Sequence, residues 1–340
     1  MKLTKEQKKA LLISSREYAQ EVRWKSWWVF LSTTALLGGL LTVAALEVHF
    51  ALRVLSTIVA GLLVVRLFVI YHDFQHGAIL KNSVIAKVLF EIVGFLMLSP
   101  RSTWKESHDY HHKHNSKIYG QSHGTFPVMT TEEYAQASWL KRLGYTINRH
   151  PITLAFGYIT VFFWGITLQS FLMSPKRHWD CLLAVLIHVG LVVMLAMTNW
   201  VALLMAFILP FAIGSGLGSY LFYAQHNFPE VEFRTEADWD YTDAALLSSG
   251  FMKMSKIMHW FTANIGYHHV HHLHSLIPFY RLPEAMNGIE ELQNPKTTSL
   301  SPKNVFQCLR LKLWCTESSK MVGRLTRRKR KAIAAVTAGS

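Results

Sequence analysis

The amino-acid sequence predicts an all-α integral membrane protein with four transmembrane helices, further helices at the membrane interface and a histidine-rich cytoplasmic cap. Three observations lead to this prediction. The 340 residues are 51% apolar and only 16% charged, a low charged fraction for a soluble protein. Long apolar segments alternate with polar ones, and the histidines gather in the polar segments. The net charge of +14 is concentrated in those polar segments as well.

Four apolar segments are long enough to cross a bilayer, for which a helix needs about 20 residues. They are residues 27–46, 50–71, 181–197 and 200–223. The basic segment 1–26 precedes the first of them, and the preference of Lys and Arg for the cytoplasmic side places this end inside. The polar segments that follow the second and fourth spans then lie on the same side.

Two other apolar segments are not expected to cross the membrane. Residues 84–99 are short, contain Lys87 and Glu91 and end at Pro100, so they are expected to lie in the interface. Residues 152–173 are long enough to span, but basic residues flank both ends. A segment with both ends inside is re-entrant or interfacial.

We divide the chain into a cytoplasmic N-terminal segment of residues 1–26, a central domain of residues 27–319 and a basic flexible tail of residues 320–340. The tail contains five consecutive basic residues at 327–331. In a membrane protein such a cluster predicts attraction to anionic lipid, and we expect no nucleic-acid partner.

The last span carries Gly214, Gly216 and Gly218 at every second position. A nucleotide-binding turn with this spacing follows a strand, whereas these glycines lie inside an apolar helix. The run therefore predicts close packing of this helix against its neighbours.

Nine histidines form the main chemical signal of the sequence. HDFQH at 72–76 places two of them at i and i+4, and HDYHH at 108–112 and HHVHH at 268–272 each place three at i, i+3 and i+4, so each set shares one helix face. A ninth, in YAQHNF, follows the fourth span. The nine are His72, His76, His108, His111, His112, His226, His268, His271 and His272. All lie on one membrane face in the predicted topology.

Nine imidazoles exceed the three or four protein ligands of a zinc site. Imidazole also suits iron, and two iron ions with four or five nitrogens each would use the whole set and leave positions open for oxygen. The Glu-x-x-His motif of soluble two-iron bundles is absent, so the sequence predicts a two-iron centre of a histidine-rich type. Asp73 and Asp109 each follow the first histidine of a cluster and are candidates to orient an imidazole.

The remaining histidines are expected to lie outside the ligand set. Four of them adjoin a cluster but break its spacing: His114, His123, His269 and His274. Five others have no cluster partner and are expected to be ordinary structural residues: His49, His150, His178, His188 and His259.

With these motifs the sequence resembles the membrane fatty acid desaturases. HDFQH, HDYHH and HHVHH match that family's HxxxH, HxxHH and HxxHH boxes in order, and residues 220–283 are similar to bacterial acyl-lipid desaturases of the omega-6 (delta-12) type. The resemblance implies four membrane helices under a cytoplasmic cap that holds two irons, with the nine histidines as ligands, in a bacterial inner membrane. It also implies molecular oxygen as a substrate and an external electron donor, by analogy ferredoxin.

The expected function is oxygen-dependent desaturation of a lipid-borne fatty acyl chain. An unactivated methylene has no acidic proton, so acid–base catalysis cannot remove its hydrogen and a redox centre is needed. One alternative is a two-iron hydroxylase or ketolase that acts on a carotenoid or another lipid. A membrane metal transporter or sensor is a more remote alternative, because transport would place ionisable residues along the spans.

Overall fold

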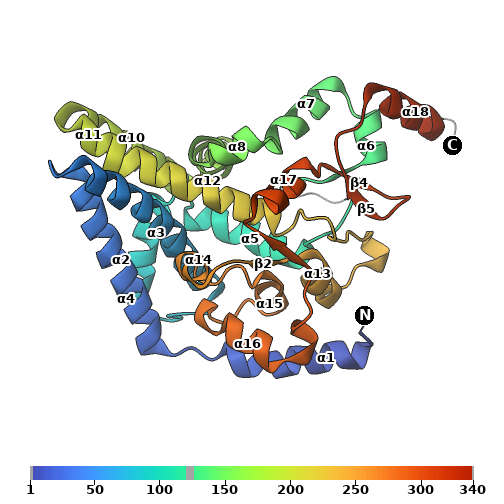
Figure 1. Cartoon of the computed structure of the whole chain (residues 1–340), viewed down its shortest axis with the longest axis horizontal. Coiled ribbons are helices and arrows are strands. Elements are labelled where there is room, and N and C mark those ends of the chain that lie inside the picture. The colour runs from blue at the N-terminus through green and yellow to red at the C-terminus, as the bar shows by residue number, and fades with distance from the viewer. Residues whose placement is uncertain (1–2, 120–125, 339–340) are drawn as a thin grey trace.

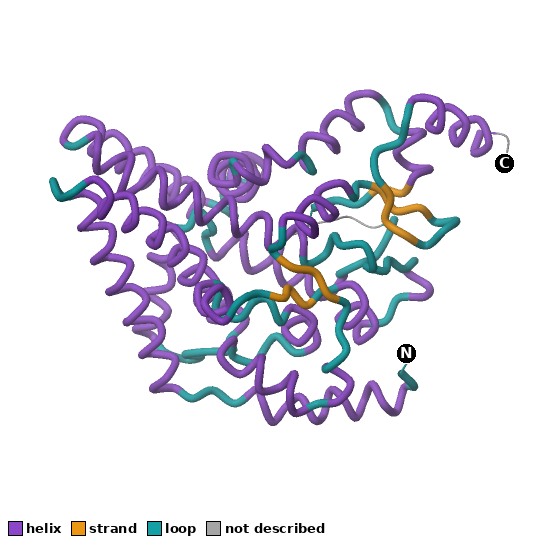
Figure 2. Tube along the Cα trace, in the orientation of Figure 1, coloured by secondary structure: helices purple, strands orange, loops and turns teal. Residues whose placement is uncertain are grey.

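The computed structural model describes residues 3–119 and 126–338, which are mostly helical (Figures 1 and 2). Among these residues, four helices are long and apolar enough to cross a membrane. They are α2 (Arg23–Ala45), α3 (Phe50–His76), α10 (Trp179–Thr198) and a continuous helix composed of α11 (Trp200–Ala202), η3 (Leu203–Ile208) and α12 (Leu209–Ala224). The four predicted spans are confirmed as long apolar helices, with ends that differ by a few residues.

Helix α3 is the centre of the bundle and packs against both α2 and α12. At its crossing with α12, a Cβ atom on Gly214 would lie 2.6 Å from Val64 Cγ1 and 2.9 Å from the carbonyl oxygen of Gly61. A Cβ atom on Gly216 would lie 2.9 Å from the carbonyl oxygen of Ala155 in α8 (Pro151–Ala155). These two glycines therefore serve close packing as predicted, whereas Gly218 has no atom within 4 Å of its Cβ position.

The helix 200–224 contains a wide π turn, η3, directly before Pro210. Proline donates no backbone hydrogen bond and its ring crowds the preceding turn, so a wider turn relieves the crowding but leaves a carbonyl to be satisfied. The Thr57 hydroxyl of α3 donates to the carbonyl oxygen of Met205 at 2.8 Å. A side chain of the neighbouring helix thus satisfies backbone that the irregular turn exposes.

The two segments expected not to cross are shorter than a span. Residues 84–99 form α4 (Val84–Leu96), and residues 152–173 are divided among α8, the π-helical η2 (Tyr158–Leu168) and α9 (Gln169–Met173). Neither is among the helices long enough to cross. Helix η2 packs against α10 and α12 and so forms part of the bundle wall.

The cap covers one end of the bundle (Figure 1). Its main elements are α5 (Arg101–His114), η4 (Glu236–Asp238), α13 (Tyr241–Ser248), β2 (Phe251–Lys253), α14 (Lys256–Phe261), α15 (His268–Leu273), η5 (Phe279–Arg281), α16 (Leu282–Gly288), η6 (Glu290–Leu292) and β3 (Thr297–Ser299), which pairs in parallel with β2. The N-terminal α1 (Lys5–Ser14) and η1 (Ser15–Ala19) run along the edge of the cap. Lys8 attaches α1 to α13 through ion pairs with Asp240 at 2.9 Å and Asp243 at 2.8 Å.

The C-terminal segment differs from the expected flexible tail. It belongs to a subdomain composed of β1 (Met129–Thr130), α6 (Thr131–Gln136), α7 (Trp139–Asn148), α17 (Pro302–Arg310), β4 (Leu313–Cys315), β5 (Lys320–Val322) and α18 (Arg327–Ala338). Strand β5 pairs with β4, which also pairs with β1, and α18 packs against α6. Met321 is buried and Val322 packs against Tyr134 and Tyr145, so this part of the tail is held by apolar contacts.

Replacing Gly214 by Ala should destabilise the bundle, because the added methyl group overlaps Val64 and the backbone of Gly61. Overpacking of this kind costs about 1–3 kcal/mol, which would lower the midpoint of thermal unfolding of the purified protein in detergent. Gly218→Ala is the matched control: it is the same change on the same helix, at a position with free space. Equal midpoints for the two variants would contradict the packing role of Gly214.

Candidate metal centre

The nine predicted histidines converge inside the cap, although they come from four separate parts of the chain. They form two groups. Within each group, the ligand atoms all lie within 4.8 Å of one another. One group contains His72, His76, His108, His112 and His271, and the other contains His111, His226, His268 and His272. The nine thus divide into five and four, as expected for two metal ions.

The spacing of the Nε2 atoms fits a bound cation. In the group of five, Nε2 of His72 lies 2.8 Å from that of His108 and 3.2 Å from that of His76. In the group of four, Nε2 of His226 lies 2.8 Å from that of His268 and 3.1 Å from that of His111. Ligands at right angles around a metal, each about 2.1 Å from it, are about 3 Å apart.

Hydrogen bonds among the rings cannot account for this arrangement. A neutral imidazole has one N–H, and several Nε2 atoms here face more than one other Nε2 atom. Lone pairs that meet without a donor repel each other, whereas a cation between them would satisfy all of them. The residues therefore fit two histidine-bound metal ions.

The histidines of α3 lie beyond the part of the helix that a bilayer needs. Helix α3 has 27 residues, so its last turns reach into the cap and carry His72 and His76 on one face. It ends at Gly77, which has φ of +76° and forms a left-handed C-cap. Helix α5 carries the second cluster on its buried face.

Helix α15 is held in place by a close backbone contact. The Met252 N–H of β2 donates to the carbonyl oxygen of Gly266 at 2.8 Å. A Cβ atom on Gly266 would lie 2.8 Å from the Met252 carbonyl oxygen, so a larger residue would push α15 away from β2. Gly266 therefore sets the position of the third histidine cluster.

Asp73 lies where the sequence placed it, beside the first histidine. One carboxylate oxygen lies 3.2 Å from His72 Nδ1, and the other accepts the Phe279 N–H at 2.6 Å. A Nδ1–H donor bound to this carboxylate fixes the tautomer that leaves the Nε2 lone pair free for a metal. Because Phe279 follows α15, Asp73 also joins α3 to the segment after the third cluster.

Asp109 does not have this role. Its carboxylate accepts from Lys105 Nζ at 2.9 Å, one turn earlier on α5, and its side chain is partly exposed. The sequence did not reveal a different orienting group, the backbone carbonyl of Ser248, which lies 3.0 Å from His226 Nδ1. A backbone acceptor from another segment leaves no signal in sequence spacing.

Burial favours the neutral form of the seven predicted ligand imidazoles that come from α5, α15 and the segment after α12, and the neutral form is the one that binds metal. Burial lowers the pKa of six of them well below the ordinary value, and other histidines add to the effect; the pKa of His226 is lowered to about 4. The six are His108, His111, His112, His268, His271 and His272. At neutral pH these rings present lone pairs and no charge.

The histidines beside the clusters have other partners. His269 Nε2 lies 3.1 Å from a backbone carbonyl oxygen, and His274 Nδ1 lies 2.9 Å from a serine hydroxyl of the N-terminal segment. His114 stacks on a tyrosine of its own helix. None of these three belongs to either group, and His123 lies outside the described residues.

The five isolated histidines also lie apart from both groups. His49 and His150 accept backbone hydrogen bonds at the starts of α3 and α8. His178 lies 2.9 Å from the hydroxyl of Ser102, and His259 is partly buried against aromatic rings. His188 is buried within α10, where its Nδ1 atom lies 2.8 Å from the hydroxyl of a tyrosine in η2.

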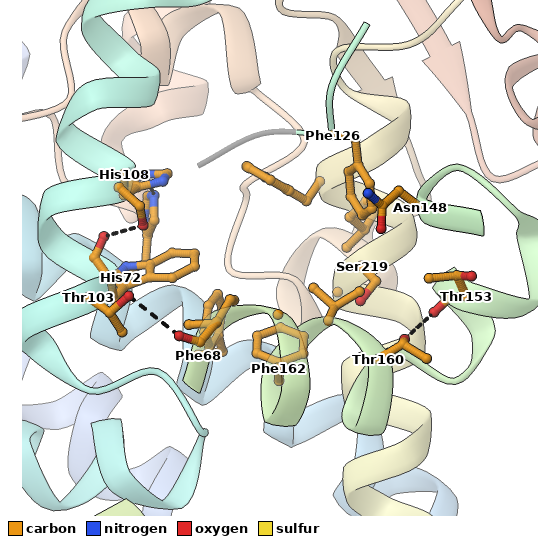
Figure 3. A pocket seen from close by; sticks show the side chains of 18 of the residues that line it. Phe68, His72, Thr103, His108, Phe126, Asn148, Thr153, Thr160, Phe162 and Ser219 are labelled. Atoms are coloured by element: carbon orange, nitrogen blue, oxygen red, sulfur yellow. Dashed lines mark hydrogen bonds between the residues drawn. The ribbon is translucent and has the colours of Figure 1, made fainter. Parts of the chain in front are cut away.

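A cavity of about 510 Å³ extends from the histidines into the bundle (Figure 3). His72 and His108 lie on one side of it, Asn148 on the other, and Phe68 and Phe162 between them. Its lining is mainly apolar, with α3, α5, η2 and α12 as walls. A long apolar chain could enter it and reach the metal groups.

Comparison with known proteins supports one family. A family model described as fatty acid desaturase matches residues 49–300. A fatty acid desaturase of Bacillus subtilis (strain 168) is 32% identical over 283 residues, which cover 82% of this chain and 79% of the relative. The sn-1 acyl-lipid omega-3 desaturase (ferredoxin) of Nostoc sp. (strain 36) is 24% identical over 285 residues, which cover 78% of this chain and 75% of the relative. The sn-1 oleoyl-lipid 12-desaturase of Synechocystis sp. (strain ATCC 27184 / PCC 6803 / Kazusa) is 23% identical over 234 residues, which cover 67% of this chain and 65% of the relative.

Replacing Asp73 by Asn should weaken metal binding, because the neutral amide supports the His72 tautomer less well than the carboxylate does. Loss of such an orienting group lowers metal affinity about 10–100-fold. The metal content per chain, measured after equilibration with graded concentrations of a chelator, should fall at a lower chelator concentration than in the unmodified protein. Asp109→Asn makes the same chemical change beside Lys105 and should leave the curve unaltered. A shift of similar size in both variants would refute an orienting role for Asp73.

Proposed function

Because the chain belongs to the fatty acid desaturase family, we propose that it inserts a double bond into a lipid-borne fatty acyl chain, with molecular oxygen, two histidine-bound irons and electrons from an external carrier. The family makes the chain an oxidoreductase enzyme and an integral membrane protein. The main support for the proposal is the convergence of nine buried imidazoles beside a deep apolar cavity.

Nine residues are proposed as the iron ligands: His72, His76, His108, His111, His112, His226, His268, His271 and His272. The bound irons would supply the oxidising power that removes hydrogen from an unactivated methylene. Iron is favoured over zinc because the ligand number is high and the reaction of the family is a redox reaction.

The other residues position the acyl chain and exclude water. Trp104 stacks on the ring of His108, with centroids 4.9 Å apart and an interplanar angle of 12°. Together with Phe68 and Phe222 it makes the part of the cavity beside the histidines apolar. An acyl chain held there would present one pair of methylenes to the metal groups in a dry environment.

We propose that the cap faces the cytoplasm of a bacterium and that the four spans lie in the inner membrane. The support for this orientation is the basic N-terminal segment, which packs against the cap. An electron carrier would reach the metal groups from the same side, and the net charge of +14 suits an acidic carrier. The name of the Nostoc desaturase includes ferredoxin, and we propose ferredoxin as the carrier here too.

His271→Ala should abolish the activity, because it removes a ligand from the group of five. The test is expression of the full chain in a host with ferredoxin and its reductase, followed by mass spectrometry of the acyl chains. The unmodified protein should yield chains lighter by two hydrogens, and the variant none. His274→Ala is the control. It removes an imidazole at the end of α15 that belongs to neither histidine group.

Two outcomes would overturn parts of this proposal. Unsaturated product from the His271→Ala variant would show that the ligand assignment is wrong. Product heavier by one oxygen would indicate a hydroxylase, the alternative expected from the same metal centre.

Phe162→Ala should change where the double bond is placed. Phe68 and Phe162 meet edge to face, with centroids 5.6 Å apart, and both also line a small second hollow next to Phe211. Removing the Phe162 ring would join the two spaces, so the acyl chain could move deeper past the metal groups. We expect a shifted or broadened distribution of double-bond positions, with iron content unchanged.

Phe207→Ala is the matched control for this prediction. Phe207 is buried in the same bundle but lines neither hollow, so its loss should alter stability without altering position. An unchanged distribution in the active Phe162→Ala variant would exclude this ring as a determinant of position.

A further inference from the structure

A cavity of about 390 Å³, separate from the two spaces described above, lies between α7, α17, β4 and the segment after β5. We call it the cationic pocket and define it by Tyr145, Arg149, Arg310, Lys312 and Arg324. None of the described residues that line it is acidic, and none of its four cations forms an ion pair with a described carboxylate. Four positive charges thus surround a concave space without a counter-charge.

Arg149 is the deepest of these cations and is 1% exposed. It donates to the carbonyl oxygen of Pro127 at 2.8 Å and to Asn227 Oδ1 at 2.6 Å, both of which are neutral. Its Nε atom is buried and has no hydrogen-bond partner among the described residues. A buried guanidinium is normally paired with an anion, so this one has both an unmatched charge and an unused donor.

Lys312 is a second partly buried cation of the pocket without a matching anion among the described residues. Its Nζ atom donates to the backbone carbonyl of Arg149, and it is packed near Tyr223. Burial, followed by the charges of Arg149 and Arg324, lowers the pKa of Lys312 to about 8. A bound anion would offset both of these unfavourable contributions.

The elements around the cationic pocket indicate that it lies at the level of lipid headgroups. Helix α7 exposes a row of large apolar side chains, including Trp139, Leu143 and Ile147. Ile152 of α8 and Phe306 of α17 are exposed in the same way. Helices with one apolar face exposed and basic residues beside it lie at the membrane surface, so two helices that contribute to the pocket, α7 and α17, have faces suited to contact with lipid.

The cationic pocket is also next to the cavity that leads to the histidines. Asn148 and Pro127 line that cavity, and Arg149 follows Asn148 and donates to Pro127. In Figure 3, Asn148 lies on the wall opposite His72 and His108. One molecule could therefore place its head group in the cationic pocket and an apolar chain in the cavity.

We propose that the cationic pocket binds the phosphate group of the glycerophospholipid whose acyl chain enters the cavity beside the histidines. This inference rests on the proposed function and identifies the acyl carrier. The planar donors of arginine match phosphate oxygens two at a time. A neutral sugar head group would leave the four charges unmatched, and the exposed apolar side chains of α7, α8 and α17 favour a lipid over a soluble acidic protein.

The test measures lipid binding by the purified full-length protein in neutral detergent, without turnover. Three probes are titrated: dioctanoyl phosphatidylglycerol, galactosyl diacylglycerol with the same two chains, and inorganic phosphate. We expect the phospholipid to bind at least about tenfold more tightly than either of the others, since a charge-assisted contact is worth that much. Arg310→Gln/Arg324→Gln removes two exposed charges of the cationic pocket and should reduce this preference to less than about threefold.

Lys253→Gln/Lys303→Gln is the matched control, because it removes two exposed positive charges that do not line the cationic pocket. It should keep the full preference for the phospholipid. Equal binding of phospholipid and galactolipid by the unmodified protein would overturn the proposal. Inorganic phosphate that binds as tightly as the phospholipid would overturn the assignment to a lipid.

A further measurement separates this proposal from the proposed function. In turnover assays, the double variant should raise KM for the phospholipid and leave kcat unchanged. If the double variant instead is reduced more slowly by the electron carrier and keeps its preference for the phospholipid, the pocket binds an acidic protein and the proposal is wrong. If no desaturation occurs but the binding preference is present, only the proposed function fails.

Discussion

The structure of the cap depends on nine imidazole lone pairs that converge in a largely buried region. Such an arrangement is unfavourable unless a cation satisfies it, and a cation can do so only if the rings are held within tenths of an ångström. The surrounding contacts serve this requirement. Helix α3 is long enough to carry two rings out of the bundle, Asp73 connects it to the segment after α15, and Gly266 brings α15 against β2. The ion pairs of Lys8 add the N-terminal helix to the same assembly.

Much of this arrangement could be predicted because it is local in the sequence. Hydropathy defines the four spans, and i, i+3, i+4 spacing defines each histidine face, without knowledge of tertiary contacts. Two aspartates show what residue spacing cannot predict. Asp73 and Asp109 occupy the same position relative to a histidine, but the side of α3 that carries Asp73 faces Phe279, whereas Asp109 lies on the partly exposed side of α5 beside Lys105. Which side of a helix is covered depends on distant segments, so two aspartates with the same spacing from a histidine have different partners.

The features that sequence reasoning did not reveal all depend on long-range contacts. The Ser248 carbonyl reaches His226 from another helix, and β5 forms only because β4 is beside it. Arg149 is one of the basic residues that flank the apolar segment 152–173, yet it is buried between Pro127 and Asn227. Charge patterning gives the side of the membrane on which a residue lies, but not whether its charge has a partner.

The division of the two histidine groups along the chain has a consequence for biosynthesis. The group of five needs His271, and the group of four needs His268 and His272, so both are completed by α15. All four spans precede α15 in the sequence and are therefore synthesised before either group can close. The complete ligand set of either group therefore exists only after α15 has been synthesised, so neither complete group can guide assembly of the membrane helices before that point. A nascent chain arrested before α15 would be inserted in the bilayer with neither group complete.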